Sequence, residues 1–224
     1  MPKVAVVLSG CGFLDGAEIQ EAVFTLLYLD RAGAEVQCFA PDKPQMQVVD
    51  HRTGQPTAES RNVFTEAARI ARGQIEPLSK ATMADFDALA MPGGYGVAKN
   101  LSTFATKGSE GEVDPDLARL IGEAHRARKP ILAICISPAI LALALASVGA
   151  GANLTIGSDA GTAQAIEALG CTHEECAVDS FVADEESRII TTPAYMLGPG
   201  PKGVAAGIEM SVETLMRWLR TPVA

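Results

Sequence analysis

The sequence predicts an α/β protein, a three-layer α/β/α sandwich around a mostly parallel sheet. Short apolar runs that end at glycine or proline carry this prediction, and they span 4–8, 35–40 and 88–92. Such runs are typical of strands buried on both faces. Between the first two runs, residues 18–32 place apolar side chains on one helical face and stop at Gly33, which gives a β-α-β unit. Parallel strands joined by helices form sheets that are covered on both faces.

The rest of the chain continues this alternation after one interruption. Residues 42–79 are expected to form an insertion, with a two-stranded excursion around Thr53-Gly54 and then a helix over about 62–72. After the insertion we expect, in order, a helix over 114–128, a strand over 130–134, a helix from about 137, a strand near 154, a helix over 161–169, strands near 178 and 189, and a last helix over 203–220. The chain, residues 1–224, is therefore predicted to be one domain.

Composition excludes several classes of protein. A formal net charge of -9 opposes attraction to nucleic acid and to anionic lipid. The 5 cysteines are scattered without a C-x-x-C pair, so neither a disulfide framework nor a zinc site is expected, and a reducing compartment fits best. The first ten residues, MPKVAVVLSG, hold too short an apolar run for a secretory signal. These features predict a cytoplasmic protein without a metal.

One stretch, residues 130–151, carries no charged residue. Its length meets the criterion for a membrane-spanning helix. Pro138 would interrupt such a helix, however, and residues 131–134 already fit the spacing of the other strands. We therefore expect a central strand, a sharp turn and a buried helix with Pro138 in its first turn, and no membrane span.

Cys135 falls on that sharp turn, at the carboxyl end of a central strand, where open α/β sheets bind ligands. A nucleophile elbow needs small residues two positions before and after the nucleophile, and Ala133 and Ser137 occupy these positions. The amino end of the next helix would favour the thiolate and lower the pKa of the thiol. A free cysteine also fits this place as a small buried apolar residue, and the stretch alone leaves both interpretations open.

Several segments together resemble the ElbB-type proteins, described as isoprenoid-biosynthesis proteins with an amidotransferase-like domain and assigned glyoxalase activity. That group belongs to the PfpI and class I glutamine amidotransferase-like superfamily, whose fold is flavodoxin-like. The resemblance covers nearly the whole chain and is carried by SGCGFLDGAEIQEAV, FAPDK, ESRNVFTEAARIARG, MPGGYGVAKNLSTFA and IITTPAYM.

The resemblance implies a set of site residues. The elbow cysteine of the superfamily falls on Cys135, and its conserved glutamate, which hydrogen-bonds the cysteine, falls on Glu21. Glu18 lies one turn away on the same helical face and is expected to assist. The backbone donors of the oxyanion site fall on Gly94 and on Ile136. A Pro-Gly-Gly sequence after a strand suits this role, because glycine lets a backbone N–H group approach a ligand closely.

Other candidate residues agree less well with the superfamily. Many members have a histidine about twenty residues after the cysteine, and residues 154–159 contain none, so Asp159 is a candidate replacement. His173 belongs to an H-x-E match, but this match is not placed before the last helix, as glutamine amidotransferases require. Cys11 follows the first strand, on the same sheet edge as Cys135, and is expected to line the pocket.

The leading functional hypothesis is a cofactor-independent glyoxalase that acts on small dicarbonyls through a Cys135 hemithioacetal, and a deglycase-like activity is compatible with it. Glu21 would move protons. The alternatives are an amide hydrolase of the amidotransferase or peptidase type, and a non-enzymatic cysteine redox sensor linked to isoprenoid biosynthesis. The partners expected are a small-molecule substrate and, from the resemblance, a second copy in a homodimer. No cofactor is expected.

Overall fold

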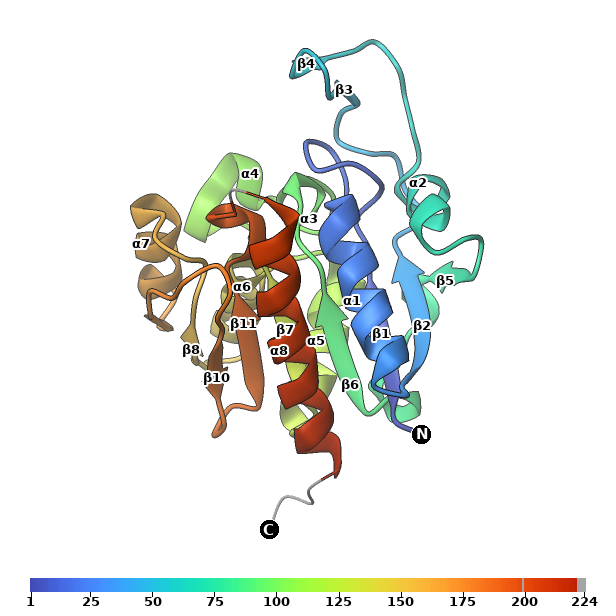
Figure 1. Ribbon diagram of the computed structural model, residues 1–224. Helices are drawn as coiled ribbons and strands as arrows, with labels where there is room; N and C mark the ends of the chain where they lie inside the picture. Colours follow the sequence, from blue (N-terminus) through green and yellow to red (C-terminus); the bar gives the residue numbers. More distant parts are fainter. Residues whose placement is uncertain (199, 221–224) are drawn as a thin grey trace.

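A seven-stranded sheet forms the centre of the computed structural model, which describes residues 1–198 and 200–220 (Figure 1). Its strands lie in the order β10-β11-β7-β6-β1-β2-β5. Their bounds are β1 (Lys3–Val7), β2 (Glu35–Ala40), β5 (Ile75–Pro77), β6 (Ala88–Met91), β7 (Ile131–Ile134), β10 (Val182–Asp184) and β11 (Ile189–Thr192). Only β10 pairs antiparallel with its neighbour within this sheet. The predicted mostly parallel sheet is thus confirmed.

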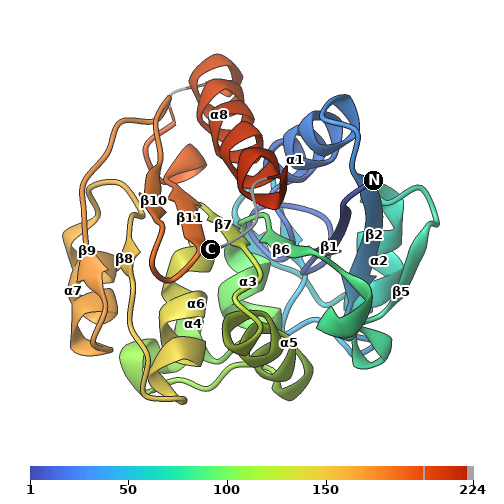
Figure 2. The same cartoon turned by 90° about the horizontal axis from the view of Figure 1, so that it is seen from below.

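Helices cover both faces of the sheet. The helices are α1 (Ile19–Arg31), α2 (Val63–Ile70), α3 (Tyr95–Asn100), α4 (Phe104–Lys107), α5 (Pro115–Arg126), α6 (Ser137–Ala146), α7 (Ala160–Ala168) and α8 (Pro201–Arg220). Seen from below, α1 and α8 lie side by side on one face, while α5 and α6 lie on the other (Figure 2). This arrangement confirms the predicted three-layer, flavodoxin-like α/β/α fold.

The charge-free stretch lies in the centre of the protein. Every residue of β7 is buried, and so is every residue of α6 from Ser137 to Leu145. A helix that is apolar all round has no face suited to water and must be enclosed. Here α3, α5, α7 and β7 enclose it. Among the described residues, no helix is long and apolar enough to cross a membrane.

The expected insertion over 42–79 is smaller than the sequence suggested. Its second half returns to the main sheet: α2 packs near β2, and β5 pairs with β2 as the edge strand, with Ile75 opposite Cys38 and Pro77 opposite Ala40. A short strand ending in proline suits a sheet edge, because the N–H group that proline lacks is not needed for a hydrogen bond to a further strand. The true excursion is the hairpin of β3 (Val49–Asp50) and β4 (Gln55–Pro56), which projects beyond the carboxyl end of the sheet (Figure 1).

Two further expectations need correction. No strand forms at Val178, which lies in a turn where the Ser180 N–H group donates to the Ala177 carbonyl at 3.0 Å; the strand starts at Val182. A small second sheet, in which β8 (Asn153–Leu154) pairs with β9 (Thr172–His173), was not foreseen. Two-residue strands and the short helices α3 and α4 are too brief to produce a periodic pattern.

Truncation of α6 tests its packing. Leu141 is fully buried, so Leu141→Ala leaves a cavity and is expected to lower the free energy of unfolding by about 2–5 kcal/mol in urea denaturation. Val148, just beyond the helix, is exposed, and Val148→Ala is expected to change the free energy of unfolding by less than about 0.5 kcal/mol. Equal effects of the two substitutions would contradict the central placement of α6.

Candidate active site

Cys135 lies on a strained turn between β7 and α6. Its φ is +63°, in the left-handed region that non-glycine residues rarely adopt. The Cys135 N–H group donates to the Thr192 carbonyl at 2.9 Å, which holds the turn against the end of β11. The neighbouring small residues Ala133 and Ser137 are fully buried, and the Ser137 hydroxyl donates to the Pro92 carbonyl at 2.9 Å. The expected sharp turn with small flanking residues is therefore present.

Two backbone N–H groups point at the sulfur of Cys135. They belong to Gly94 and Ile136, the positions indicated by the family resemblance. Gly94 has a φ of +102° and packs so tightly against the chain at Gly16–Glu18 that a Cβ atom there would lie 2.4 Å from the Gly16 carbonyl oxygen. Glycine is thus required for this loop to bring its N–H group to the sulfur.

Glu21 lies beside Cys135, fully buried on the inner face of α1. Its Oε2 atom accepts a hydrogen bond from the Gly93 N–H group at 2.9 Å, and its Oε1 atom accepts one from the Tyr195 N–H group at 3.1 Å. The carboxyl also hydrogen-bonds the Cys135 thiol. One side chain thus connects the loops after β6, β7 and β11.

Burial decides the protonation of this pair. Removal from water raises the pKa of Glu21 to about 8, although the Tyr195 and Gly93 N–H groups oppose the rise. Burial, followed by the negative charge of Glu21, also raises the pKa of the Cys135 thiol, and the Gly94 and Ile136 N–H groups only reduce this effect. The expected lowering of the thiol pKa by the helix end is therefore wrong, because desolvation and the carboxylate outweigh it.

Glu18 lies at the start of α1, where its Oε2 atom accepts the Glu21 N–H group at 2.6 Å and caps the helix. Partial burial raises the pKa of the Glu18 carboxyl. Glu18 also lines the cavity in front of Cys135. It therefore both fixes the helix turn that carries Glu21 and contributes a carboxyl group to the cavity wall.

A cavity of about 760 Å³ opens in front of Cys135 at the carboxyl end of the sheet. Its walls come from the loop after β1, α3, α4, the start of α6, the start of α7 and the loop after β11. The lining residues are Phe13, Leu14, Glu18, Gly94, Tyr95, Ala98, Lys99, Phe104, Ala105, Cys135, Ile136, Asp159, Thr162, Tyr195 and Met196. This is the position at which doubly wound sheets bind ligands.

No histidine lines this cavity in the described part of the chain. His173 is on β9, where its Nε2 atom accepts the Ile156 N–H group at 3.3 Å. Asp159 does line the cavity, but its carboxylate caps α7 by accepting the Thr162 N–H group at 2.8 Å, and the Thr162 side chain, followed by this N–H group, lowers the pKa of Asp159. The dyad of Cys135 and Glu21 is thus not extended by an imidazole.

The structure places Cys11 elsewhere than expected. Cys11 is not among the residues that line the cavity, and the charged groups that act on it are Glu66, Arg69, Asp15 and Arg61. The expectation that Cys11 lines the pocket is therefore wrong.

Tyr195 was not foreseen as a site residue. It follows Ala194, whose φ of +44° turns the Tyr195 N–H group toward Glu21. The Tyr195 hydroxyl also donates to the Gln20 side chain on α1, so the loop after β11 is joined to the same helix twice. The sequence gives no signal for this contact, since a backbone group makes it and 174 residues separate the partners.

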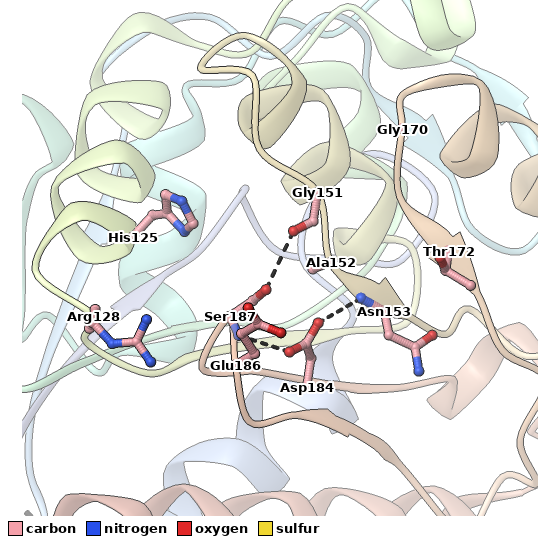
Figure 3. Close-up of a pocket in the computed structure, with 10 residues that line it drawn as sticks. All are labelled: His125, Arg128, Gly151, Ala152, Asn153, Gly170, Thr172, Asp184, Glu186 and Ser187. Atoms are coloured by element: carbon pink, nitrogen blue, oxygen red, sulfur yellow. Dashed lines mark hydrogen bonds between the residues drawn. The ribbon is translucent and has the colours of Figure 1, made fainter. Parts of the chain in front are cut away.

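A second cavity, of about 520 Å³, lies at the opposite end of the sheet, beside the residues that precede β7 and β11. Figure 3 shows its lining residues. His125 and Arg128 line one side of it. Asp184 lines the other side, where it accepts the N–H groups of Asn153 and Ser187, each at 2.8 Å, and so joins β8 to the β10–β11 turn. These polar groups already serve the fold, and no cysteine lines this cavity. The cavity at Cys135 is the better candidate for chemistry.

Comparison with known families agrees with this geometry. The model of the DJ-1/PfpI family matches residues 3–192, a span that includes Glu21, Gly94 and Cys135. The chain belongs to the DJ-1/PfpI family. A solved relative, the isoprenoid biosynthesis protein with amidotransferase-like domain from Ehrlichia chaffeensis, is 38% identical and superposes with a TM-score of 0.91, covering 98% of this chain and 100% of that one.

Other DJ-1/PfpI relatives extend the comparison. The Homo sapiens protein named glutamine amidotransferase-like class 1 domain-containing protein 3, mitochondrial, is 48% identical over 96% of this chain and 82% of its own length. The Rattus norvegicus ES1 protein homolog, mitochondrial, is 46% identical over 96% of this chain and 83% of its own length. Drosophila melanogaster DJ-1beta shares the fold, with a TM-score of 0.54 at 20% identity over the whole of both chains.

The names of these relatives contradict the expected cytoplasmic location. Both mammalian proteins, and the Danio rerio ES1 protein, are named mitochondrial, which points to a mitochondrial protein. The prediction rested on reduced cysteines and on the lack of a secretory signal in residues 1–10, which form β1 and its flanks. Neither observation distinguishes the cytoplasm from the mitochondrial matrix.

The raised pKa of Glu21 predicts a pH-dependent stability. Because the folded-state pKa, about 8, exceeds the ordinary value of 4.5, the neutral carboxyl contributes fully below about pH 4.5 and this contribution is lost as the pH rises toward 8. The melting temperature of the wild type, relative to Glu21→Gln, is therefore expected to fall by about 5 °C or more between about pH 5 and pH 8.

The control for this measurement is Glu213→Gln, which alters an exposed glutamate of α8. Its melting temperature should follow the wild type at every pH. If the difference between wild type and Glu21→Gln stayed constant over the same range, Glu21 would not be a neutral buried acid.

Proposed function

We propose that this DJ-1/PfpI protein is a cofactor-independent glyoxalase that converts glyoxal to glycolate through a hemithioacetal on Cys135. Family membership supports cysteine-based chemistry of the glyoxalase or amidotransferase type. The observation that carries the specific proposal is the hydrogen bond between the Cys135 thiol and the buried Glu21 carboxyl, beside a cavity that no histidine lines within the described chain.

The first step is addition of the sulfur to an aldehyde carbon. A C–S bond forms, the carbonyl electron pair moves to oxygen, and the thiol proton, which the Glu21 carboxylate takes up and passes on, neutralises this oxygen and leaves the carboxylate free for the next step. The Gly94 and Ile136 N–H groups, which donate to the sulfur in the free protein, stabilise the negative charge as it develops on the adjacent oxygen. An acid with a pKa of about 8 is well suited to give and take this proton near neutral pH.

The second step moves hydrogen within the adduct. The Glu21 carboxylate removes the C–H proton of the hemithioacetal carbon to give an enediol, and a proton returned to the neighbouring carbon gives a glycolate thioester. Water then cleaves the C–S bond and releases glycolate and the thiol. One carbon is oxidised and its neighbour reduced, so the reaction balances with water alone and requires no external oxidant.

Amide hydrolysis is a poorer fit, because no histidine among the described residues lines this cavity. A thiolate that attacks an amide needs an acid to protonate the leaving amine, and aldehyde addition has no leaving group. Dicarbonyl conversion therefore fits the dyad better than amidotransferase chemistry.

Removal of either member of the dyad tests the assignment. Glycolate formation from glyoxal is expected to fall at least about 10³-fold in Cys135→Ala and about 10²-fold or more in Glu21→Gln, because the first loses the nucleophile and the second the proton carrier. Turnover that survives in both variants would contradict the roles. Stoichiometric oxidation of Cys135 by mild peroxide, without any turnover in the wild type, would favour the redox sensor.

Gly93 offers a test of geometry in which neither reacting side chain is substituted. A Cβ atom on Gly93 would lie 2.3 Å from the Cys135 Cβ atom and 2.6 Å from Glu21 Oε2. Gly93→Ala must therefore displace the dyad, and we expect kcat to fall by about 10²-fold. Gly200→Ala is the control, because its added Cβ atom would meet nothing within 4 Å. Similar kcat values for the two variants would show that the position of the dyad is unimportant.

A further inference from the structure

The cavity in front of Cys135 is much larger than glyoxal. Its volume of about 760 Å³ lies within the range of roughly 300–1,000 Å³ that is usual for sites of drug-sized ligands. Glyoxal consists of two carbonyl groups joined directly, so it would contact the sulfur and leave most of the cavity filled with water. The remaining volume can hold a substituent on the dicarbonyl.

The walls of this volume are aromatic. The chain has 7 phenylalanines, 3 tyrosines and 1 tryptophan, and four of these eleven residues line this one cavity: Phe13, Tyr95, Phe104 and Tyr195. Phe13 is 45% exposed and Tyr95 is 54% exposed, although both are large rings. Exposed apolar surface gathered at one concave site is typical of a ligand-binding surface. Rings of this kind bind flat or apolar groups.

The charged groups of the wall are already engaged. Glu18 accepts the Glu21 N–H group and Asp159 accepts the Thr162 N–H group. The Lys99 ammonium donates to the Leu14 carbonyl at 2.6 Å and lies 5.4 Å from the centre of the Tyr95 ring. Two carboxylates against one ammonium give the lining a negative balance, which disfavours an anionic substituent.

The outer wall is held from outside the cavity. The N–H group of Leu14 donates to His51 Nε2 at 3.2 Å while its carbonyl accepts from Lys99, so the peptide group is fixed on both sides. The Phe13 ring meets the His51 ring edge to face, with centroids 5.3 Å apart, and the Phe13 carbonyl accepts the Tyr95 N–H group at 2.7 Å. His51 comes from the β3–β4 hairpin and does not itself line the cavity.

We propose that this aromatic cavity is a subsite for an uncharged apolar substituent, so that the preferred substrates are bulky α-oxoaldehydes, such as arylglyoxals, rather than glyoxal. The inference rests on the proposed glyoxalase function. His51 acts as a positioning residue: through Phe13 and Leu14, it holds the wall against which the substituent packs. The chemistry at Cys135 is the same, and phenylglyoxal yields mandelate.

Matched probes test the subsite in the wild type. We expect kcat/KM for phenylglyoxal to exceed that for glyoxal by at least about tenfold, through a lower KM. The anionic probe 4-carboxyphenylglyoxal has a similar shape, and we expect it to lose most of this gain in kcat/KM. Cys135-dependent turnover with a preference for glyoxal, or with no penalty for the carboxylate, would overturn this inference and leave the proposed function intact. No Cys135-dependent turnover of any α-oxoaldehyde would overturn the proposed function itself, and this inference with it.

Variants test the walls. Tyr95→Ala and Phe104→Ala are expected to raise KM for phenylglyoxal about five- to tenfold and to raise KM for glyoxal by a clearly smaller factor. His51→Ala should also raise KM for phenylglyoxal more than KM for glyoxal, although His51 touches no substrate. Phe24→Ala, which truncates a partly buried ring of α1 outside the cavity, is the control and should change KM for neither substrate. Equal losses with both substrates in the wall variants would contradict the subsite.

Discussion

The fully buried Glu21 carboxyl is the group around which the site is organised. Its two oxygens accept N–H groups from Gly93 and Tyr195, and the carboxyl hydrogen-bonds the Cys135 thiol. Each partner comes from a loop that follows a different strand of the central sheet. A buried carboxyl without such partners would be strongly destabilising, so the loops and the helix α1 must adopt these positions together.

The same burial defines the chemistry. A cysteine nucleophile usually becomes reactive beside a positive group that lowers the pKa of its thiol. Here the neighbour is an acid, and burial raises the pKa of both members of the pair. Such a pair places a proton between a nucleophile and a base. This arrangement suits a reaction in which one proton moves between adjacent atoms of the substrate and no leaving group needs a proton.

Different parts of the chain build the inner and outer regions of the cavity. The inner region comes from turns of the parallel sheet and from glycines that pack backbone against backbone, such as Gly94 against Gly16. The outer region depends on the β3–β4 hairpin, which contacts the loop after β1 through His51. A fold that separates reacting groups from recognising groups in this way can keep one reaction while the periphery sets the substrate.

The sequence by itself determined the fold class and the place of Cys135. Apolar runs of strand length, the charge-free stretch and the small residues around the cysteine are local signals, and burial on both faces of a sheet gives them one interpretation. Glu21 needed the family resemblance, because a glutamate on an amphipathic helix is otherwise indistinguishable from a surface charge. Only the tertiary structure decided the protonation of the dyad, the role of the Tyr195 N–H group, the orientation of Cys11 and the contact of His51 with the cavity wall. Each of these depends on the surroundings of an atom, which residues distant in the sequence supply, and composition and periodicity carry no record of such contacts.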